Sequence, residues 1–266
     1  QMKNAEYDAV DVEFDSAGYI YKLSESVLMF KGYKVAYADD EETADKSSKL
    51  KGISENDVVV ASTGVIGQAL PIEPIQKGVE ELKNILSRDG GTNAAEAIMT
   101  TDTVKKEWAV QLTLDGKTVT IGGIAKGSGM IHINMGTTLS FVTTDAAISA
   151  ERLRSALVEA ADVSYNMVSV DGDTSTNDTL AVMASGLAGN TEITEKNDDY
   201  YKFTEALTAG FKKVAKMLAA DGEGATKLVI CKVDGAKNDK NAKTIAKSII
   251  CSSLVKAAMF GADANC

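Results

Sequence analysis

The residues with the clearest potential for chemistry lie between Lys126 and Asp145, where glycines surround a strand-like run that ends in Gly136-Thr137-Thr138. Gly136 permits a strained backbone just before Thr137. Attack of the Thr137 hydroxyl on the preceding carbonyl carbon gives an ester that water opens, leaving Thr137 as a new N-terminus. Its α-amine, with a pKa of roughly 8, can then act as a base for its own hydroxyl. The pattern fits a self-cleaving threonine nucleophile, and an ordinary strand end fits the same residues.

Other catalytic bases are scarce in this chain. His132 is the single histidine, so a Ser-His-Asp or Cys-His mechanism would have to use it, and a multi-histidine metal site cannot be built. Cys231, Cys251 and Cys266 lie far apart without a C-x-x-C pair, which argues against a disulfide framework or a structural zinc site. We therefore expect no metal and no cofactor, and a reducing, cytoplasmic setting.

Two motifs resemble ligand-binding loops and fail on spacing. The Gly122–Gly129 segment is rich in glycine, but Lys126 precedes its glycine, whereas a phosphate-binding loop places Gly before Lys-Ser/Thr. The acidic segment Asp171–Asp178 begins like a calcium loop, but its sixth position is Thr176 and its twelfth is Val182, where glycine and glutamate are needed. A turn and helix N-cap explains the acidic segment equally well.

Composition narrows the classes of partner. The chain has 266 residues, with 28 basic and 38 acidic side chains and a net charge of −10, which disfavours binding to a phosphate backbone. No window approaches the roughly 18 consecutive apolar residues of a membrane span, and the N-terminal residues lack the pattern of a signal peptide. We expect neither nucleic acid nor membrane as a partner.

The first half contains three elements that can position these residues. Residues 57–61 form a β-branched run that predicts a buried strand, which delivers the loop Ser62-Thr63-Gly64. A helix is expected from Pro71 to the Gly90-Gly91 pair. Apolar and polar residues alternate on both sides of Asp115-Gly116, and this pattern predicts a hairpin with a two-residue turn. The expected helix has its apolar residues at helical spacing: Ile75, Val79, Leu82, Ile85 and Leu86.

The second half alternates helices and strands. Ser149 is placed to cap a helix, and a long helix is expected at about 201–220. Strands are expected around 167–170 and at 226–233, and residues 241–260 should be mostly helical. This order predicts an α/β or α+β fold, a layered helix–sheet sandwich. The buried stripe of the long helix is expected to contain Tyr201, Phe203, Leu207, Phe211, Val214 and Leu218.

Six blocks, in chain order, resemble the glutamate N-acetyltransferase (ornithine acetyltransferase) family. The resemblance implies self-cleavage into α and β chains that stay together, with the N-terminal threonine of the β chain as the acyl-carrying nucleophile. It further implies acetyl transfer from N2-acetylornithine to glutamate, in arginine biosynthesis, and leaves open whether acetyl-CoA is an alternative donor. The blocks are residues 61–67, 97–107, 122–146, 169–179, 221–227 and 260–266.

The resemblance also implies roles for individual residues. Thr137 matches the nucleophile, and the Gly136–Thr137 bond matches the cleavage site. Thr63 and Gly64 match the oxyanion pair, one donating a hydroxyl and the other a backbone N–H.

Three further residues match substrate-contacting positions: Thr100, Lys126 and Glu223. Lys126 is suited to hold a substrate carboxylate, and Glu223 the ornithine ammonium. A snorkelling surface lysine and a helix-cap glutamate are the plain structural alternatives.

The match divides the chain into an unassigned segment 1–56, an α-chain-like portion 57–136 and a β-chain-like portion 137–266. Residues 6–14 resemble a strand found late in the family, which indicates a rearranged order. The family usually has proline at Ile133, alanine at Gly136 and tryptophan at Cys266, and a C-terminal block that supplies an asparagine and a threonine to the substrate pocket is absent here.

These departures leave rival functions open. An incomplete pocket predicts either a non-catalytic or unprocessed scaffold of the same fold, or an amide hydrolase that uses the same Thr137, because water then competes with glutamate. The leading hypothesis is the acetyltransferase, acting on small amino-acid substrates as a homo- or hetero-oligomer.

Overall fold

The computed structural model describes residues 20–23, 27–30, 59–61, 64, 69, 71–82, 87, 90–132, 138–175 and 177–263. A four-stranded sheet lies at the centre, in the order β3 (Lys106–Leu114), β4 (Lys117–Lys126), β5 (Leu139–Thr144) and β6 (Thr179–Ala184). The β3–β4 and β4–β5 pairs are antiparallel, whereas β5 and β6 are parallel. The predicted α/β class is confirmed.

The hairpin predicted around Asp115-Gly116 joins β3 to β4. Both residues have positive φ, 47° and 70°, as a two-residue turn of this type requires. Because the turn fixes the register, Lys106 lies opposite Ala125, near the far end of the hairpin, where β4 ends at Lys126.

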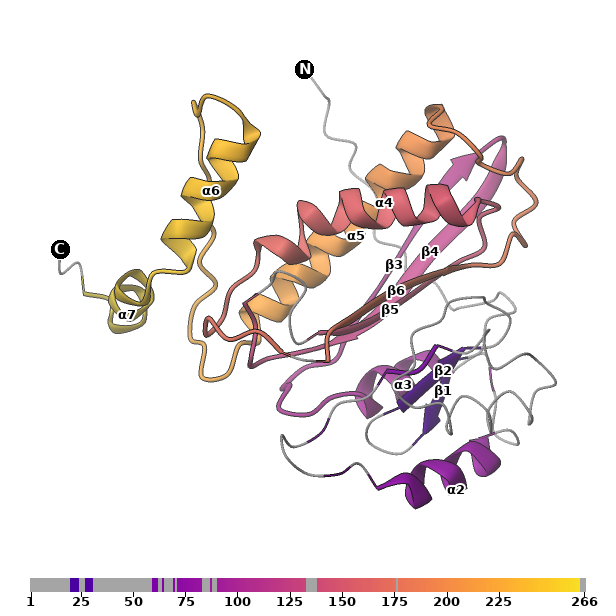
Figure 1. Cartoon of the computed structure of the whole chain (residues 1–266), viewed down its shortest axis with the longest axis horizontal. Coiled ribbons are helices and arrows are strands. Elements are labelled where there is room, and N and C mark those ends of the chain that lie inside the picture. The colour runs from indigo at the N-terminus through magenta and orange to yellow at the C-terminus, as the bar shows by residue number, and fades with distance from the viewer. Residues whose placement is uncertain are drawn as a thin grey trace.

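Helices cover both faces of the sheet (Figure 1). On one face lie α4 (Ala150–Asp162) and α5 (Asp198–Ala220), and on the other lie α3 (Gly90–Ala97) and the antiparallel pair of β1 (Ile20–Leu23) and β2 (Val27–Phe30). Helix α2 (Ile72–Leu82) contacts β1. Strands β4, β5 and β6 therefore contribute side chains to two separate apolar cores, as in other layered α/β proteins, whereas β3 contributes to the larger core.

Helix α5 supplies much of the larger core. Asn197 caps its N-terminus by accepting a hydrogen bond from the Tyr200 N–H at 2.9 Å. Gly210 lets the helix approach the Trp108 ring so closely that an added Cβ would lie 1.9 Å from Cζ3. Helix α4 is capped by Ser149, as predicted. The large side chains in the buried stripe of α5 are Tyr200, Phe203, Leu207, Phe211, Val214 and Leu218.

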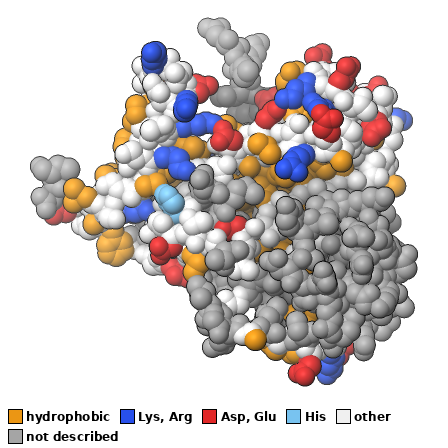
Figure 2. Space-filling view, in the orientation of Figure 1, with side chains coloured by type: hydrophobic (Ala, Val, Ile, Leu, Met, Phe, Trp, Pro, Cys, Tyr) orange, Lys and Arg blue, Asp and Glu red, His pale blue; other side chains and the backbone are white. Residues whose placement is uncertain are grey.

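The C-terminal arm, residues 223–263, extends away from the sheet and carries α6 (Asp239–Ile250) and α7 (Ser253–Gly261). Hydrophobic side chains and lysines are interspersed on its surface (Figure 2). None of the described helices is by itself long and apolar enough to cross a membrane, although α6 and α7, bent by 57°, pass such a test together by length and composition alone.

Several predicted helix details differ from the structure. Tyr201 is exposed, because the stripe of α5 runs through Tyr200, one position away. Gly90 and Gly91 begin α3 and do not end the preceding helix, which is described as far as Leu82. The alanines of α3 give it a narrow face that packs closely against the sheet.

Two predicted strands are also wrong. Residues 226–233 pair with no strand among the described residues, so their strand propensity has no ladder to join. A 3₁₀ turn (Tyr165–Met167) occupies the start of the strand expected at 167–170, and only Ser169 there forms an isolated bridge, with His132. Residues 59–61 are buried in part but carry no strand assignment.

Candidate functional site

The predicted site residues fall into two groups. Thr63, Gly136 and Thr137 lie outside the described residues, and Gly64 is described and exposed. Thr100, Lys126 and Glu223 are described, and they come together at the end of β4 although they are distant in sequence.

Lys126 is the last residue of β4 and is only 5% exposed. Its Nζ donates a hydrogen bond to Thr100 Oγ1 at 3.1 Å. Burial lowers the pKa of Lys126, and the nearby carboxylates of Asp102, Asp178 and Glu223 partly offset this effect. A buried ammonium that has no close ion-pair partner among the described residues is suited to binding a ligand carboxylate.

Glu223 reaches the same place from the segment after α5. Its N–H donates to the carbonyl oxygen of Ser128 at 2.8 Å. Its carboxylate lies so close to Gly129 that an added Cβ there would be 2.5 Å from Glu223 Cδ. The strand end therefore presents a buried cation, and an exposed anion flanks it.

A buried ion cluster beneath these residues holds the three segments together. Lys106 Nζ lies 2.6 Å from Asp102 Oδ1 and 2.6 Å from Asp221 Oδ2. Asp102 also accepts hydrogen bonds from the N–H groups of Gly127 at 2.7 Å and Thr100 at 3.2 Å. Through these bonds the cluster fixes the backbone of Gly127, next to Lys126, and that of Thr100. Its third member, Asp221, lies two residues before Glu223.

The two carboxylates of this cluster are anions in a buried setting. Burial by itself would raise the pKa of Asp102, but hydrogen bonds from the Gly127 N–H and from Lys106 hold it below its usual range. Burial opposes ionisation of Asp221 in the same way, and Lys106 and Thr103 lower its pKa. The cluster is therefore a charged triad in which one lysine bridges two carboxylates.

This triad was not predicted from the sequence. Asp102 and Lys106 are four residues apart, but they lie in a loop and at the start of a strand, where that spacing predicts no contact. Asp221 lies 115 residues from Lys106, and no pattern in the chain predicts that contact.

Asp178 immediately precedes β6, and it contacts Thr138, the residue before β5. It accepts a hydrogen bond from the N–H of Thr138, and the carbonyl oxygen of Thr138 accepts one from Thr179 N–H at 2.9 Å. Burial raises the pKa of Asp178 to about 7, against the lowering effects of the Thr138 N–H and of Lys126. The acidic loop therefore ends in a carboxylate that contacts the residue after Thr137, and it is more than a turn.

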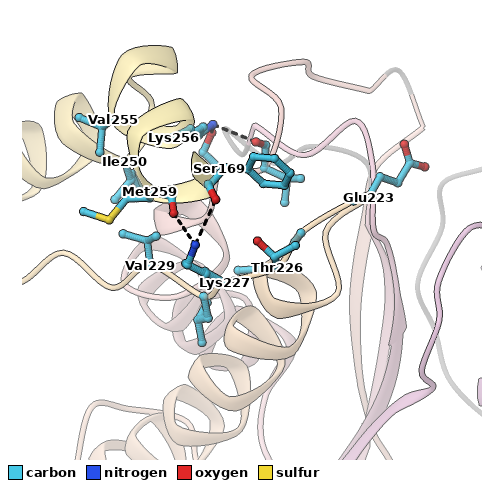
Figure 3. Close-up of a pocket in the computed structure, with 15 residues that line it drawn as sticks. Ser169, Glu223, Thr226, Lys227, Val229, Ile250, Val255, Lys256 and Met259 are labelled. Atoms are coloured by element: carbon cyan, nitrogen blue, oxygen red, sulfur yellow. Dashed lines mark hydrogen bonds between the residues drawn. The ribbon is translucent and has the colours of Figure 1, made fainter. Parts of the chain in front are cut away.

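A cavity of about 230 Å³ lies between the C-terminal arm and residues 169–170, and neither Lys126 nor Thr100 lines it. Its two lysines bind backbone oxygens: Lys227 Nζ lies 2.7 Å from the carbonyl of Met259, and Lys256 Nζ lies 2.9 Å from that of Val170. Glu223 points away from both lysines (Figure 3). Because these ammonium groups already have partners, the cavity is a packing joint between α7, the segment that follows α5 and residues 169–170.

These features define a class of α/β protein in which a central strand ends in a buried lysine beside a threonine and a glutamate. The chain belongs to the ArgJ family, which it matches over residues 31–266.

Over the aligned residues, about half of the positions are identical between this chain and its curated relatives. The arginine biosynthesis bifunctional protein ArgJ of Geobacillus stearothermophilus is 52% identical over 235 residues, which cover 88% of this chain and 56% of that protein. The same values hold for ArgJ of Bacillus subtilis (strain 168), and ArgJ 1 of Clostridium acetobutylicum is 53% identical over 234 residues. The chain thus spans about half the length of the curated relatives it matches.

Solved structures match as well. The crystal structure of the arginine biosynthesis bifunctional protein argJ from Bacillus halodurans is 50% identical, covers 47% of this chain and 59% of that one, and has a TM-score of 0.45.

Proposed function

We propose that this chain is part of an acetyltransferase that moves acetyl from N2-acetylornithine to glutamate, in arginine biosynthesis, after self-cleavage at Gly136–Thr137. The observation that carries the proposal is the convergence of Thr100, Lys126 and Glu223, the same three residues that the family resemblance matches to substrate contacts. The names of the relatives, which state a role in arginine biosynthesis, support it.

The charges suit an amino-acid substrate. The buried Lys126 ammonium is complementary to an α-carboxylate, and Glu223 is complementary to the side-chain ammonium of ornithine. Thr100 Oγ1 orients the lysine by accepting its hydrogen bond. Glutamate shares the carboxylate but lacks the ammonium, so the two substrates depend differently on Glu223.

The proposed reaction passes the acetyl group through Thr137. As Thr137 Oγ bonds to the acetyl carbon, its proton moves to the neutral α-amine, and Thr63 and Gly64 donate to the developing oxyanion. The bond from the acetyl carbon to the ornithine nitrogen breaks as that nitrogen receives the proton. The amine of glutamate then attacks the acetyl-threonine and returns a proton to the threonine oxygen.

The sheet supports association of the two fragments after cleavage. Residues 57–136 contain β3 and β4, and residues 137–266 contain β5 and β6. Six residue pairs join β4 to β5, from Ile121↔Thr144 to Lys126↔Leu139, so the cut leaves paired strands on either side. We further propose a cytoplasmic protein that needs no cofactor, takes acetyl-CoA as an alternative donor and assembles as an oligomer.

Intact mass spectrometry and a transfer assay on the complete protein test this function. The wild type should divide before Thr137 and move acetyl to glutamate, and Thr137→Ala should remain one uncut, inactive chain. A wild type that stays uncut after prolonged incubation would support the scaffold, and release of acetate without transfer would support a hydrolase.

A further inference from the structure

Asp102 lies in the loop before β3, and this loop runs alongside the end of β4. Three successive residues of the loop contact the strand end and the two residues after it, in the pairs Thr100 with Lys126, Thr101 with Ser128 and Asp102 with Gly127. The first two pairs join side chains, at 3.1 Å and 2.6 Å, whereas the carboxylate of Asp102 accepts from a backbone N–H at 2.7 Å. Asp102 therefore ties the loop to the main chain at the end of β4.

The carboxylate of Asp102 is buried and uses both of its oxygens. Oδ1 accepts from the Gly127 N–H at 2.7 Å and from Lys106 Nζ at 2.6 Å, and Oδ2 accepts from the Thr100 N–H at 3.2 Å. Because all three partners are donors, a side-chain amide or a protonated carboxyl at this place would turn an N–H or O–H toward one of them. The position therefore requires an ionised carboxylate.

This anion also acts on the Lys126 ammonium. Burial disfavours the charged form of that lysine, and among the nearby charges Asp102 has the largest opposing effect. Asp178 and Glu223 act in the same direction as Asp102, and Lys106 acts against them. No close ion pair joins Lys126 to Asp102 in the part of the chain that the structure describes. Asp102 thus stabilises the ammonium from a distance and leaves its protons available to a ligand.

We propose that Asp102 is the positioning residue of a carboxylate-binding site: it fixes the backbone on both sides of the hydrogen bond between Lys126 and Thr100, and its negative charge sustains the ammonium that receives the ligand. The inference rests on the proposed function, because it takes that ligand to be the α-carboxylate of an amino-acid substrate. The triad of Asp102, Lys106 and Asp221 has one cation and two anions, so one negative charge remains in excess.

The test is the pH dependence of binding of N-acetylglutamate, measured by titration calorimetry on the complete protein. A Thr137→Ala background prevents transfer of the acetyl group. Both carboxylates of this probe stay ionised above about pH 6, so a loss of affinity at higher pH reports on the protein. Affinity should fall as the pH rises through the lowered pKa of Lys126, below the ordinary 10.5. Removing a neighbouring anion disfavours the ammonium, so Asp102→Asn should move this fall down by about 1 pH unit.

Asp221→Asn is the matched control. It also leaves Lys106 with one carboxylate, and it should lower the urea midpoint by a comparable amount. Asp221 is not among the charges that dominate at Lys126, so the fall in affinity should stay at the wild-type pH. A purely structural role of the triad predicts the same pH dependence for the two variants. Lys126→Met should remove the fall altogether, which assigns it to that lysine.

Two further measurements keep the outcome decisive. The alkaline limb of kcat/KM for N2-acetylornithine, measured on the protein with Thr137 intact, should move in the same direction in Asp102→Asn. Asp102→Ser carries the same prediction if Asp102→Asn does not fold, because a rotatable hydroxyl can still accept a hydrogen bond but has no charge. If neither variant folds, the carboxylate is needed for the fold itself and a role specific to the site is overturned.

The possible failures are distinguishable. If acetyl is transferred but Asp102→Asn leaves the binding curve and the alkaline limb in place, the inference is wrong and the proposed function stands. If N-acetylglutamate binds with the expected shift but no acetyl is transferred, the inference stands and the proposed function fails. An equal shift in Asp221→Asn, or no binding of N-acetylglutamate, would overturn the inference whatever the protein transfers.

Discussion

Lys126 and Glu223 differ in how the protein holds them, and the difference sets what each can recognise. Lys126 is buried and its ammonium is directed by Thr100, whereas Glu223 is exposed and its carboxylate rests against Gly129. A buried charge interacts more strongly with a ligand than an exposed one, because water screens it less. The lysine should therefore dominate affinity, and the glutamate should discriminate between substrates.

Substitution of each residue should separate these effects. Lys126→Met should reduce kcat/KM for both N-acetylornithine and glutamate by roughly 10–100-fold, since both carry the α-carboxylate. Glu223→Gln should reduce it for N-acetylornithine by about tenfold and leave glutamate nearly unchanged. Steady-state kinetics with each substrate varied in turn check this. Equal damage to both substrates by Glu223→Gln would leave that residue with a structural role only.

The protonation of Asp178 should be visible in stability. In the unfolded chain its pKa is near the ordinary 3.8, and in the folded, uncut chain it is about 7, so the folded state holds more protons between these values. Stability from this group is therefore present at low pH and is lost as pH rises through the window. Allowing for solvent screening of a half-buried group, the loss is about 1–2 kcal/mol.

Urea unfolding of uncut Thr137→Ala, compared with Thr137→Ala/Asp178→Asn, isolates this contribution. The difference in unfolding free energy between the two proteins should change by that amount from pH 4 to pH 7.5, because all other groups cancel. A constant difference would show that Asp178 titrates alike in both states.

At the scale of elements, the buried triad of Asp102, Lys106 and Asp221 joins β3 to the end of α5. Removing the shared cation leaves two carboxylates buried side by side. Lys106→Met should therefore destabilise the protein by about 3–5 kcal/mol, measured by urea unfolding.

The neighbouring Lys105 is a matched control. It is partly exposed and pairs with Glu96 at 3.4 Å and Glu107 at 3.5 Å, so Lys105→Met should cost less than about 1 kcal/mol. Similar losses for the two variants would mean that burial gives the triad no special weight.

Elements with their own local signals were predictable from sequence. The Asp115-Gly116 hairpin, the Ser149 cap and the long helix near 201–220 each depend on turn or capping chemistry within a few residues. The strand expected at 226–233 depends instead on a neighbour to pair with. Leu228, Val229 and Ile230 are 41%, 40% and 67% exposed, so a strong β pattern by itself did not produce a strand.

The candidate site shows the same division. The resemblance identified Thr100, Lys126 and Glu223, and the structure brings these together. The long-range contacts around them, from Asp221 to Thr103 and from Asp178 to Thr138, were not predicted, because they cross 118 and 40 residues of chain. Long-range hydrogen bonds leave no periodic trace in a sequence.

At the scale of the whole molecule, the proposed cut falls between neighbouring strands in the middle of the sheet. Strands β4 and β5 are paired along six residues and are both buried, so the fragments should stay together without a covalent bond. Uncut and cut proteins therefore have nearly the same folded state and different unfolded states, one chain in the first case and two in the second.

This difference predicts a concentration dependence. The urea midpoint of the cut wild type should fall on dilution, with each tenfold dilution costing about 1.4 kcal/mol, whereas that of uncut Thr137→Ala should not move. Equilibrium unfolding at several protein concentrations, with cleavage verified by mass, checks this. A midpoint of the cut protein that ignores concentration would show that the fragments do not separate on unfolding.

The position of the proposed cut within the sheet also imposes an order in time. The two central strands find each other while they are still tethered by a short connection, and the chemistry that severs the tether needs the finished fold. Once cut, a molecule that unfolds must find its other fragment by diffusion, so dilute fragments recover slowly or aggregate. The working protein is then maintained by a slow rate of unfolding, and its useful lifetime is a kinetic property fixed at the moment of cleavage.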